Sequence, residues 1–428
     1  MSKLIELEEP RERVVLVGAP LKSVSPLALD EHLQELARLV DTAGGEIVGE
    51  LRQRIDSPSP KFYLGEGKAA ELRDTAKELD ATLVVFDEDL SPAQGKNLEE
   101  FTGIRIMDRS EIILDIFATR ARSNEAKMQV ELAQLQYLLP RLTRMWAHLS
   151  RVRGGVGMRG PGETQLETDR RMINHRIARL KDELERVAQQ RATQRKGRER
   201  AFQAALVGYT NAGKSSLLRA LSGADVFIED RLFATLDATT RAVDLGEGDE
   251  VLVTDTVGFI RKLPHRLVAS FRATLEEAGE ADLLLHVVDL AHSDWEEQRL
   301  VVDEVLDELG LRAHPTALVF NKTDQVSPDE LESWKRRFSG HPERPAVFVS
   351  AVTPDGAEPL KELLRQGLRA QRAEVRLEIP IHEGGLVAEV YRDGEVLERE
   401  DLGTAVRLRA RVPPATLGRL RSRGVKVW

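Results

Sequence analysis

The first 118 residues alternate short apolar runs with amphipathic stretches. Segments such as Leu27–Val40 and Lys68–Leu79 carry apolar residues three and four positions apart, which is the period of one helix face. Apolar runs of strand length, bounded by turn residues, lie at Arg13–Gly18, Glu46–Ile55, Thr82–Phe86 and Ile104–Met107. Strands that alternate with helices predict a small, mostly parallel sheet. We therefore expect an N-terminal α/β domain at residues 1–118.

Residues 119–200 have a helical period instead. One apolar seam comprises Leu135, Leu138, Leu142, Met145 and Leu149, and a second comprises Ile173, Ile177, Leu180, Leu184 and Val187. The connector Arg151–Arg171 has five glycines and one proline between Gly154 and Gly162, which does not suit a helix. Thr164, followed by Glu167, matches a capping box that would open the second helix. The pattern predicts an antiparallel helical hairpin whose apolar seams pack together, with a glycine-rich tip.

The remaining chain divides into two further regions. Residues 201–372 form a second α/β pattern, in which each apolar run ends in a polar motif. Residues 373–428 show shorter elements typical of a small α+β domain. Within this last region we expect strands at Val375–Ile379, Glu395–Glu400, Ala405–Arg411 and Val425–Trp428, and helices near Gly385–Val390 and Pro413–Arg423. A length of 428 residues agrees with several domains rather than one core.

Composition excludes several classes of protein. The chain has no cysteine, which excludes disulfides and cysteine-ligated zinc and fits a reducing compartment. Its first residues are partly acidic and lack the apolar stretch of a signal peptide. No run of about eighteen apolar residues is present, as a membrane span would need. We expect a cytoplasmic protein, and we expect it to be monomeric.

The net charge of −9 hides a marked asymmetry. From Arg120 to Arg200 there are 19 Lys and Arg against 9 Asp and Glu, a net of +10, so the remainder carries −19. Gly403–Trp428 has 7 basic residues and no acidic ones. A concentrated basic segment favours a polyanionic partner, although solvated arginines on exposed helices would give the same count. At the hairpin tip, Arg151, Arg153 and Arg159 suit phosphate oxygens.

The strongest motif follows the apolar run Phe202–Val207. The sequence GYTNAGKS at residues 208–215 has the spacing GxxxxGK[ST] of a phosphate-binding loop. Gly208 and Gly213 permit the turn that directs backbone NH groups at phosphates beside a helix N-terminus. Lys214 would reach the β- and γ-phosphates, and the Ser215 hydroxyl would bind Mg²⁺. We expect a doubly wound P-loop sheet at residues 201–372.

Three later motifs select the nucleotide. DTVG ends an apolar strand, so that Asp255 can hold Mg²⁺ through water and the Gly258 NH can bond the γ-phosphate. In NKTD, the Asp324 carboxylate can accept two hydrogen bonds from guanine, which adenine cannot donate, and the SA pair can meet guanine O6. The motifs lie where open α/β sheets bind ligands, and they predict GTP rather than ATP. The predicted nucleotide contacts are Gly208, Tyr209, Thr210, Asn211, Ala212, Gly213, Lys214, Ser215, Asp255, Thr256, Val257, Gly258, Asn321, Lys322, Thr323, Asp324, Ser350, Ala351 and Val352.

The segment Arg231–Arg241 separates the first two motifs. A loop at this position would close on Mg²⁺ and the γ-phosphate through a threonine hydroxyl and release after hydrolysis. Thr235, Thr239 and Thr240 all qualify by spacing, and the residues alone do not rank them.

Taken together, the motifs resemble the HflX family, within the Obg–HflX group of translational GTPases. GYTNAGKS, FATLD, DTVGF, NKTD and SA follow that family's pattern, and RGPGETQLETDRR resembles its glycine-rich signature. The resemblance implies that Thr235 is the switch I magnesium ligand and that Lys214, Thr235 and Gly258 act on the γ-phosphate. It extends the nucleotide site to all five residues of FATLD, which are Phe233, Ala234, Thr235, Leu236 and Asp237. It also implies binding to the 50S ribosomal subunit, including rRNA, and the splitting or rescue of stalled ribosomes.

One residue departs from the Ras-like pattern. Phe259 follows DTVG, where Ras-like GTPases carry a glutamine that orients the attacking water. Because phenylalanine cannot polarise water, we expect slow hydrolysis by the protein alone and stimulation by ribosomes. Asn211 resembles a residue that supports K⁺ coordination in some GTPases, so K⁺ is a second candidate cofactor beside Mg²⁺; a loop-shaping role is the alternative.

A different class of function also fits the motifs. A regulatory GTPase at the membrane periphery could use the hairpin to dock a partner protein, and the family's history with a membrane protease gives this alternative weight. The seams argue against it, because their apolar residues are expected to cover each other and leave arginine on the outside.

Overall fold

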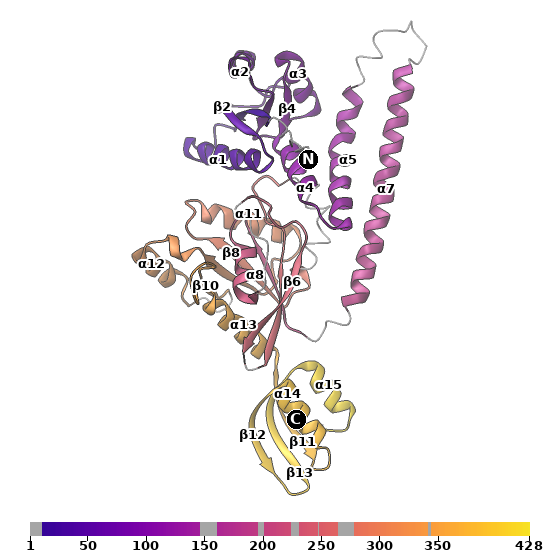
Figure 1. Ribbon diagram of the computed structural model, residues 1–428, viewed down its shortest axis with the longest axis vertical. Helices are drawn as coiled ribbons and strands as arrows, with labels where there is room; N and C mark the ends of the chain where they lie inside the picture. The colour runs from indigo at the N-terminus through magenta and orange to yellow at the C-terminus, as the bar shows by residue number, and fades with distance from the viewer. Residues whose placement is uncertain are drawn as a thin grey trace, which may run out of the picture. The chain divides into compact units, whose positions relative to one another are not determined.

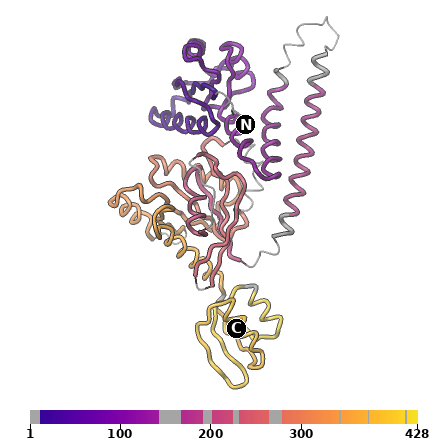
Figure 2. Tube along the Cα trace, in the orientation of Figure 1, coloured from indigo at the N-terminus to yellow at the C-terminus, as the bar shows by residue number. Residues whose placement is uncertain are grey.

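The computed structural model describes residues 11–145, 161–195, 201–223, 231–246, 248–263, 278–340 and 344–428 (Figure 2). The chain forms two compact units. The first comprises Met1–Val187 with two later segments, Asp230–Asp237 and Lys262–Phe271. The second comprises the remainder, Ala188–Glu229, Ala238–Arg261 and Arg272–Trp428. The first unit therefore recruits two segments that lie, in sequence, among the predicted GTP-binding motifs.

The first unit contains the expected parallel sheet, in the order β2-β1-β3-β4. Residues Val14 to Val17 of β1 are almost fully buried, as expected for a strand covered on both faces. Ser25 and Ser91 cap α1 and α3 through their side chains, each followed by a proline at the first helical position. The elements are β1 (Arg13–Gly18), α1 (Pro26–Thr42), β2 (Glu46–Arg52), α2 (Glu66–Glu78), β3 (Leu83–Phe86), α3 (Pro92–Thr102), β4 (Arg105–Asp108) and α4 (Arg109–Arg120). The predicted α/β pattern is confirmed.

Two long helices follow, α5 (Asn124–Met145) and α7 (Pro161–Arg195), and they run side by side (Figure 1). Arg176 on α7 donates two hydrogen bonds of 2.7 Å to the Glu131 carboxylate on α5. The capping box at Thr164 is wrong: α7 begins at Pro161, a residue that suits the first helical turn because it has no NH to satisfy. The tip arginines Arg151, Arg153 and Arg159 lie outside the described residues.

The seam predicted for α5 is only partly correct. Leu138 is 44% exposed, whereas Val130, Ala133 and Tyr137 are buried, and α5 packs against α3 and α4. On α7, Leu180 is fully buried, as the second seam requires. The first helix of the hairpin therefore uses its apolar face on the N-terminal domain rather than solely on its partner helix.

The predicted GTP-binding region folds as a six-stranded sheet in the order β10-β9-β8-β5-β7-β6. All neighbouring strands are parallel except β6 and β7. The strands are β5 (Gln203–Gly208), β6 (Thr239–Gly246), β7 (Asp249–Asp255), β8 (Leu283–Asp289), β9 (Thr316–Asn321) and β10 (Ala346–Phe348). The helices are α8 (Lys214–Ser222), α11 (Trp295–Glu308), α12 (Pro328–Phe338) and α13 (Glu358–Gln371), with a 3₁₀ turn at Thr323–Gln325. This is the doubly wound P-loop sheet that the motifs predict.

The C-terminal region is an antiparallel sheet in the order β12-β13-β11-β14, with two helices. Alternate residues of β13 are buried, so Val406 and Leu408 enter the core while Arg407 and Arg409 lie on the opposite face. The elements are β11 (Ala373–Pro380), α14 (Gly384–Asp393), β12 (Glu395–Asp401), β13 (Ala405–Val412), α15 (Pro414–Ser422) and β14 (Lys426–Val427). The multidomain α/β fold with a small α+β end is confirmed; the exact domain boundaries remain predictions.

The basic character of this C-terminal region is largely neutralised. Arg407 pairs with Glu378 and Glu400, and Arg409 pairs with Glu374 and Glu398. These glutamates lie on the neighbouring strands, so the charge count of Gly403–Trp428 alone overstated its attraction for a polyanion. Separately, none of the helices in the described part of the chain is long and apolar enough to cross a membrane.

Candidate nucleotide-binding site

The turn between β5 and α8 has the geometry of a phosphate-binding loop. Gly208 has a φ of 154°, and a Cβ on it would lie 2.3 Å from the Val287 carbonyl oxygen. Gly213 has a φ of 93°, and its Cβ would lie 2.2 Å from Asn321 Nδ2. Both positions therefore require glycine, for conformation and for space.

Lys214, the first residue of α8, turns back over this loop. Its side chain is buried, and Nζ donates to the carbonyl oxygens of Gly208 (3.1 Å) and Tyr209 (2.9 Å). Burial lowers the pKa of Lys214 to about 8, against the opposing effect of the Asp255 charge. The ammonium therefore stays protonated near neutral pH while poised inside the loop. A Cβ at Gly258 would lie 3.0 Å from Lys214 Nζ, so the backbone of the DxxG glycine lies next to the lysine ammonium.

Two side-chain oxygens lie close together at the next position. Ser215 Oγ donates to Asp255 Oδ2 at 2.6 Å, and Asp255 ends β7 almost fully buried. Within the described ranges, no cluster of three or more acidic or histidine side chains could hold a metal. Ser215 and Asp255 form a pair of oxygen donors, which is the type of donor that magnesium prefers in proteins.

The side chain of Asn321 links the predicted base-recognition motifs to the phosphate loop. Asn321 Nδ2 donates to the Ala212 carbonyl (2.9 Å), and its Oδ1 accepts from the Ala351 NH (3.2 Å). Ser350 Oγ donates to Asp324 Oδ1 at 2.6 Å, which orients the carboxylate expected to read guanine. The NKTD and SA motifs are thus adjacent and hydrogen-bonded, as the order of β9 and β10 requires.

The other NKTD residues shape the same loop. Lys322 adopts a left-handed φ of 62°, and its Nζ lies 2.7 Å from Asp289 Oδ2. Thr323 Oγ1 donates to the Val349 carbonyl at 3.0 Å. In the second motif, Thr256 Oγ1 donates to the Leu206 carbonyl at 2.7 Å, which fixes the DxxG backbone to β5.

Phe259 has a structural role that the sequence did not reveal. Its side chain is 1% exposed, its NH donates to the Gly208 carbonyl (3.0 Å), and its carbonyl accepts from the Thr210 NH (2.6 Å). These bonds join the DxxG segment to the phosphate loop as a short parallel bridge. Phe259 therefore contributes backbone and apolar bulk, and nothing that could orient water. Asn211 has a left-handed φ of 62° within this loop.

The three threonine candidates differ in structure. Thr239 and Thr240 lie in β6, where Thr239 pairs with Asp255 and Thr240 with Thr254. Thr235 precedes the strand and lies in the segment that belongs to the first unit. Only Thr235 therefore has the loop position expected of a switch residue, while its part in Mg²⁺ binding stays a prediction.

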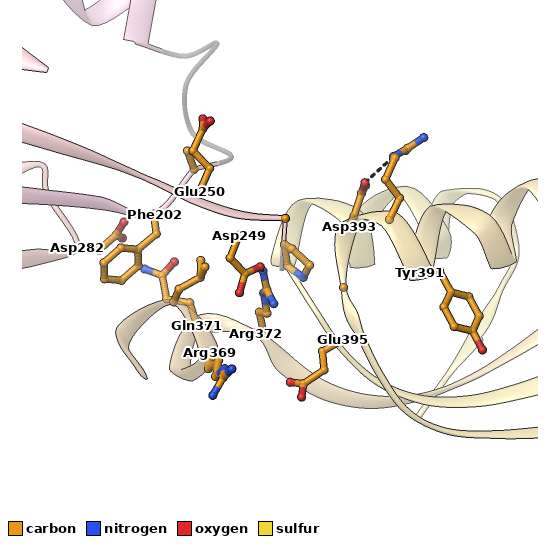
Figure 3. A pocket seen from close by; sticks show the side chains of 16 residues that line it. Phe202, Asp249, Glu250, Asp282, Arg369, Gln371, Arg372, Tyr391, Asp393 and Glu395 are labelled. Carbon is orange, nitrogen blue, oxygen red and sulfur yellow. Dashed lines mark hydrogen bonds and ion pairs between the residues drawn. The ribbon is translucent and has the colours of Figure 1, made fainter. Parts of the chain in front are cut away.

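A separate cavity lies away from these motifs, within the second unit (Figure 3). Its volume is about 520 Å³, and its walls come from the start of β7, the end of α13 and residues of the C-terminal domain. Arg372 pairs with Asp249 across it, and Tyr391 and Glu395 also line it. None of its lining residues belongs to the predicted nucleotide site.

Three protein-family models match the chain. "GTP-binding GTPase N-terminal" matches residues 30–118, "GTP-binding GTPase Middle Region" matches residues 120–198, and "50S ribosome-binding GTPase" matches residues 203–322. The three matches follow one another along the chain. They include most of the predicted N-terminal domain and of the hairpin, the first two nucleotide motifs, and Asn321 and Lys322 of the third.

Named relatives match the chain over most of its length. GTPase HflX of Escherichia coli K12 is 45% identical over 387 residues, which cover 90% of each chain. GTPase HflX of Magnetococcus marinus is 43% identical over 97% of this chain and 96% of its own. Among solved structures, a GTP-binding protein from Sulfolobus solfataricus in complex with GDP is 24% identical with a TM-score of 0.43, covering 83% of this chain and 98% of that one.

Proposed function

The chain belongs to the GTPase HflX family and is a GTP-binding enzyme that hydrolyses GTP, and from this premise we propose that it is a switch acting on the 50S ribosomal subunit. In this proposal the GTP-bound form associates with the subunit, contacts its rRNA, and splits or rescues stalled ribosomes. The protein acts in the cytoplasm as a monomer, and the ribosome stimulates a hydrolysis that is slow without it.

The observation that carries the nucleotide assignment is the hydrogen-bonded convergence of four motifs at the carboxyl edge of one sheet. Asn321 bonds both Ala212 and Ala351, and Gly258 approaches Lys214. We propose that Lys214 and the loop NH groups hold the β- and γ-phosphates, and that the Gly258 NH bonds the γ-phosphate. Asp324, held by Ser350, selects guanine.

Mg²⁺ is the proposed cofactor, with Ser215 and Thr235 as its protein ligands. It would supply positive charge that stabilises the negative charge developing on the γ-phosphate as this group is transferred to water. Ser215 already shares a hydrogen bond with Asp255, whose carboxylate would hold the cation through a water molecule. K⁺ is a second cation to test: a faster GTPase rate in K⁺ than in Na⁺ at matched ionic strength supports the role of Asn211, and equal rates refute it.

The proposed rRNA contact rests on charge. On α7, the side chains of Arg170, Arg171, Lys181 and Arg186 are exposed to solvent. An exposed basic helix attracts phosphate backbones and releases counterions on binding. The glycine-rich tip with its three arginines would add contacts of the same kind.

Co-sedimentation tests this function. The purified protein is mixed with 50S subunits and with 70S ribosomes in GTP, GDP or a non-hydrolysable GTP analogue. We expect tight, salt-sensitive association with 50S subunits in the analogue and separation of 70S particles into subunits. Association that does not depend on the nucleotide would refute the proposal. Deleting residues 151–162 should abolish splitting and leave GTP affinity intact.

A further inference from the structure

The segment that carries Thr235 is anchored on both sides of that residue to the first unit. The segment Asp230–Asp237 belongs to this unit by its contacts, although β6 begins only two residues after it. Leu232, Phe233 and Leu236 are each at most 5% exposed. A loop that only covered a nucleotide would not bury three large apolar side chains, so these residues hold the segment in place.

One anchor is aromatic and lies before Thr235. The ring of Phe233 packs edge-to-face on Phe117 of α4, with 4.6 Å between ring centroids and 89° between ring planes. Phe233 also adopts a left-handed φ of 55°, which a bulky residue holds only when its surroundings compensate. The apolar packing around Phe233 supplies that compensation.

The other anchor is polar and lies two residues after Thr235. The Asp237 carboxylate accepts hydrogen bonds from the backbone NH groups of Arg122 (3.1 Å) and Ser123 (3.2 Å) and from the Ser123 hydroxyl. Ser123 directly precedes α5, and its Oγ accepts from the Ala126 NH at 3.0 Å, the geometry of an N-cap. Asp237 therefore adds a full negative charge at the positive end of the first hairpin helix.

A similar anchor follows the DxxG motif. Lys262 lies four residues after Gly258, also belongs to the first unit, and donates to Asp87 Oδ2 at 2.8 Å. Its Nζ lies 3.6 Å from Glu88 Oε1. Both acidic groups are nearly buried, and they follow β3 of the N-terminal sheet. The segments after two nucleotide motifs are thus held by the same unit through independent contacts.

We propose that Ser123 and Asp237 are positioning residues for Thr235, so that the N-terminal unit pre-organises the switch for Mg²⁺·GTP. Thr235 lies four residues before Thr239, the first residue of β6. Fixing the residues on either side of Thr235 reduces the conformational entropy lost when it binds the cation. The inference rests on the proposed role of Thr235.

The test compares two serine caps in the full-length protein. Ser123→Ala removes the hydroxyl that links α5 to Asp237. Ser25→Ala is the matched control, because Ser25 caps α1 through the same bond to the NH three residues on, at 3.0 Å, in the same unit. Dissociation constants are measured with fluorescent GDP and with a fluorescent, non-hydrolysable GTP analogue, in Mg²⁺ and after its chelation.

We expect Ser123→Ala to weaken binding of the GTP analogue at least threefold in Mg²⁺, with GDP affinity within twofold of wild type. Ser25→Ala should leave both affinities within twofold, and the defect of Ser123→Ala should vanish without Mg²⁺. Unchanged or tighter analogue binding in Ser123→Ala overturns the inference, because the anchor would then be neutral or would oppose the GTP state. If Ser123→Ala does not fold, Ser123→Gly, which also removes the hydroxyl and leaves a residue that N-caps tolerate, replaces it under the same criteria.

A third variant separates this inference from the proposed function. Thr235→Ala should weaken analogue binding in Mg²⁺ if Thr235 is a ligand. A normal affinity in Thr235→Ala would refute the assignment of the magnesium ligand itself. A defect in Thr235→Ala without one in Ser123→Ala would refute only the positioning role of the N-terminal unit.

Discussion

At the scale of single residues, the Ser350 hydroxyl orients Asp324, the carboxylate that we propose selects guanine. Ser350 Oγ holds one carboxylate oxygen of Asp324 at 2.6 Å and also accepts weakly from the NH groups of Val352 and Thr353 at 3.3 Å. The orientation of the carboxylate therefore depends on a neighbouring motif rather than on NKTD alone.

Replacing Asp324 by asparagine should transfer preference from guanine to xanthine nucleotides, because the amide donates where the carboxylate accepted. A bidentate hydrogen-bonded pair contributes about 2–3 kcal/mol, so we expect GTP affinity to fall by roughly 30- to 150-fold. Competition between GTP and XTP for the purified protein measures this change. An unaltered GTP affinity would mean that the base pocket lies elsewhere.

The lowered pKa of Lys214 predicts a pH dependence. In the free protein this lysine loses its proton near pH 8, whereas bound phosphates would hold the proton on it. Nucleotide affinity should therefore fall as pH rises above about 8, since binding must then take up a proton. Nucleotide dissociation constants measured from pH 6.5 to 9.5 test this dependence. Lys214→Ala is the control, because its weak residual binding should not change with pH in this way.

At the scale of helices and strands, α5 is fixed to the N-terminal sheet by Arg141. Its guanidinium donates to Asp108 Oδ2 (2.8 Å) and to the Leu90 carbonyl (3.0 Å), and it stacks 3.4 Å over the ring of Tyr137. Asp108 is 2% exposed, and burial raises its pKa. The helix therefore docks through a nearly buried ion pair as well as through its apolar face.

Arg141→Met should lower the stability of the first unit by about 2 kcal/mol, because the buried Asp108 loses its charged partner. Thermal unfolding of the full chain, followed by circular dichroism, would register an earlier transition. Arg179→Met, which removes an exposed pair with Glu183 on α7, should cost less than about 0.5 kcal/mol. Equal destabilisation by both substitutions would contradict this account of α5 docking.

At the scale of the whole molecule, basic residues differ in how far they are neutralised. The arginines of β13 pair with glutamates on both neighbouring strands, whereas several basic side chains of α7 are exposed. A partner with a phosphate backbone should therefore bind the hairpin and not the C-terminal sheet.

Charge removal tests that distribution. Arg170→Gln with Arg171→Gln should reduce 50S affinity several-fold. The double substitution should also make the slope of log K against log salt concentration less steep by up to about two, one for each phosphate that the helix no longer neutralises. Arg407→Gln with Arg409→Gln should change neither quantity by more than about twofold. The reverse pattern in filter-binding or sedimentation assays at several salt concentrations would show that the C-terminal sheet is the surface that binds the subunit.

Sequence patterns predicted the sheets, most helices and the four nucleotide motifs, because strand and helix periods and loop motifs are local. They did not predict that α5 would bury Tyr137 against the N-terminal helices and expose Leu138. The apolar pattern of one helix shows which face is buried but not which element covers it. Nor did they reveal the cross-strand pairing of Arg407 and Arg409. One local feature of the sequence pointed to the packing of Phe233 in the first unit: the segment around it is too apolar to lie in solvent.

The double role of Asn321 limits how this GTPase can be redesigned. The nitrogen of its side-chain amide donates to the phosphate loop at Ala212, and the oxygen accepts from the SA motif at Ala351. A substitution there would lower affinity for every nucleotide at once, whatever the base. An orthogonal enzyme, fed by an unnatural triphosphate while the native enzyme works beside it, must therefore be engineered through Asp324, with Asn321 left as it is.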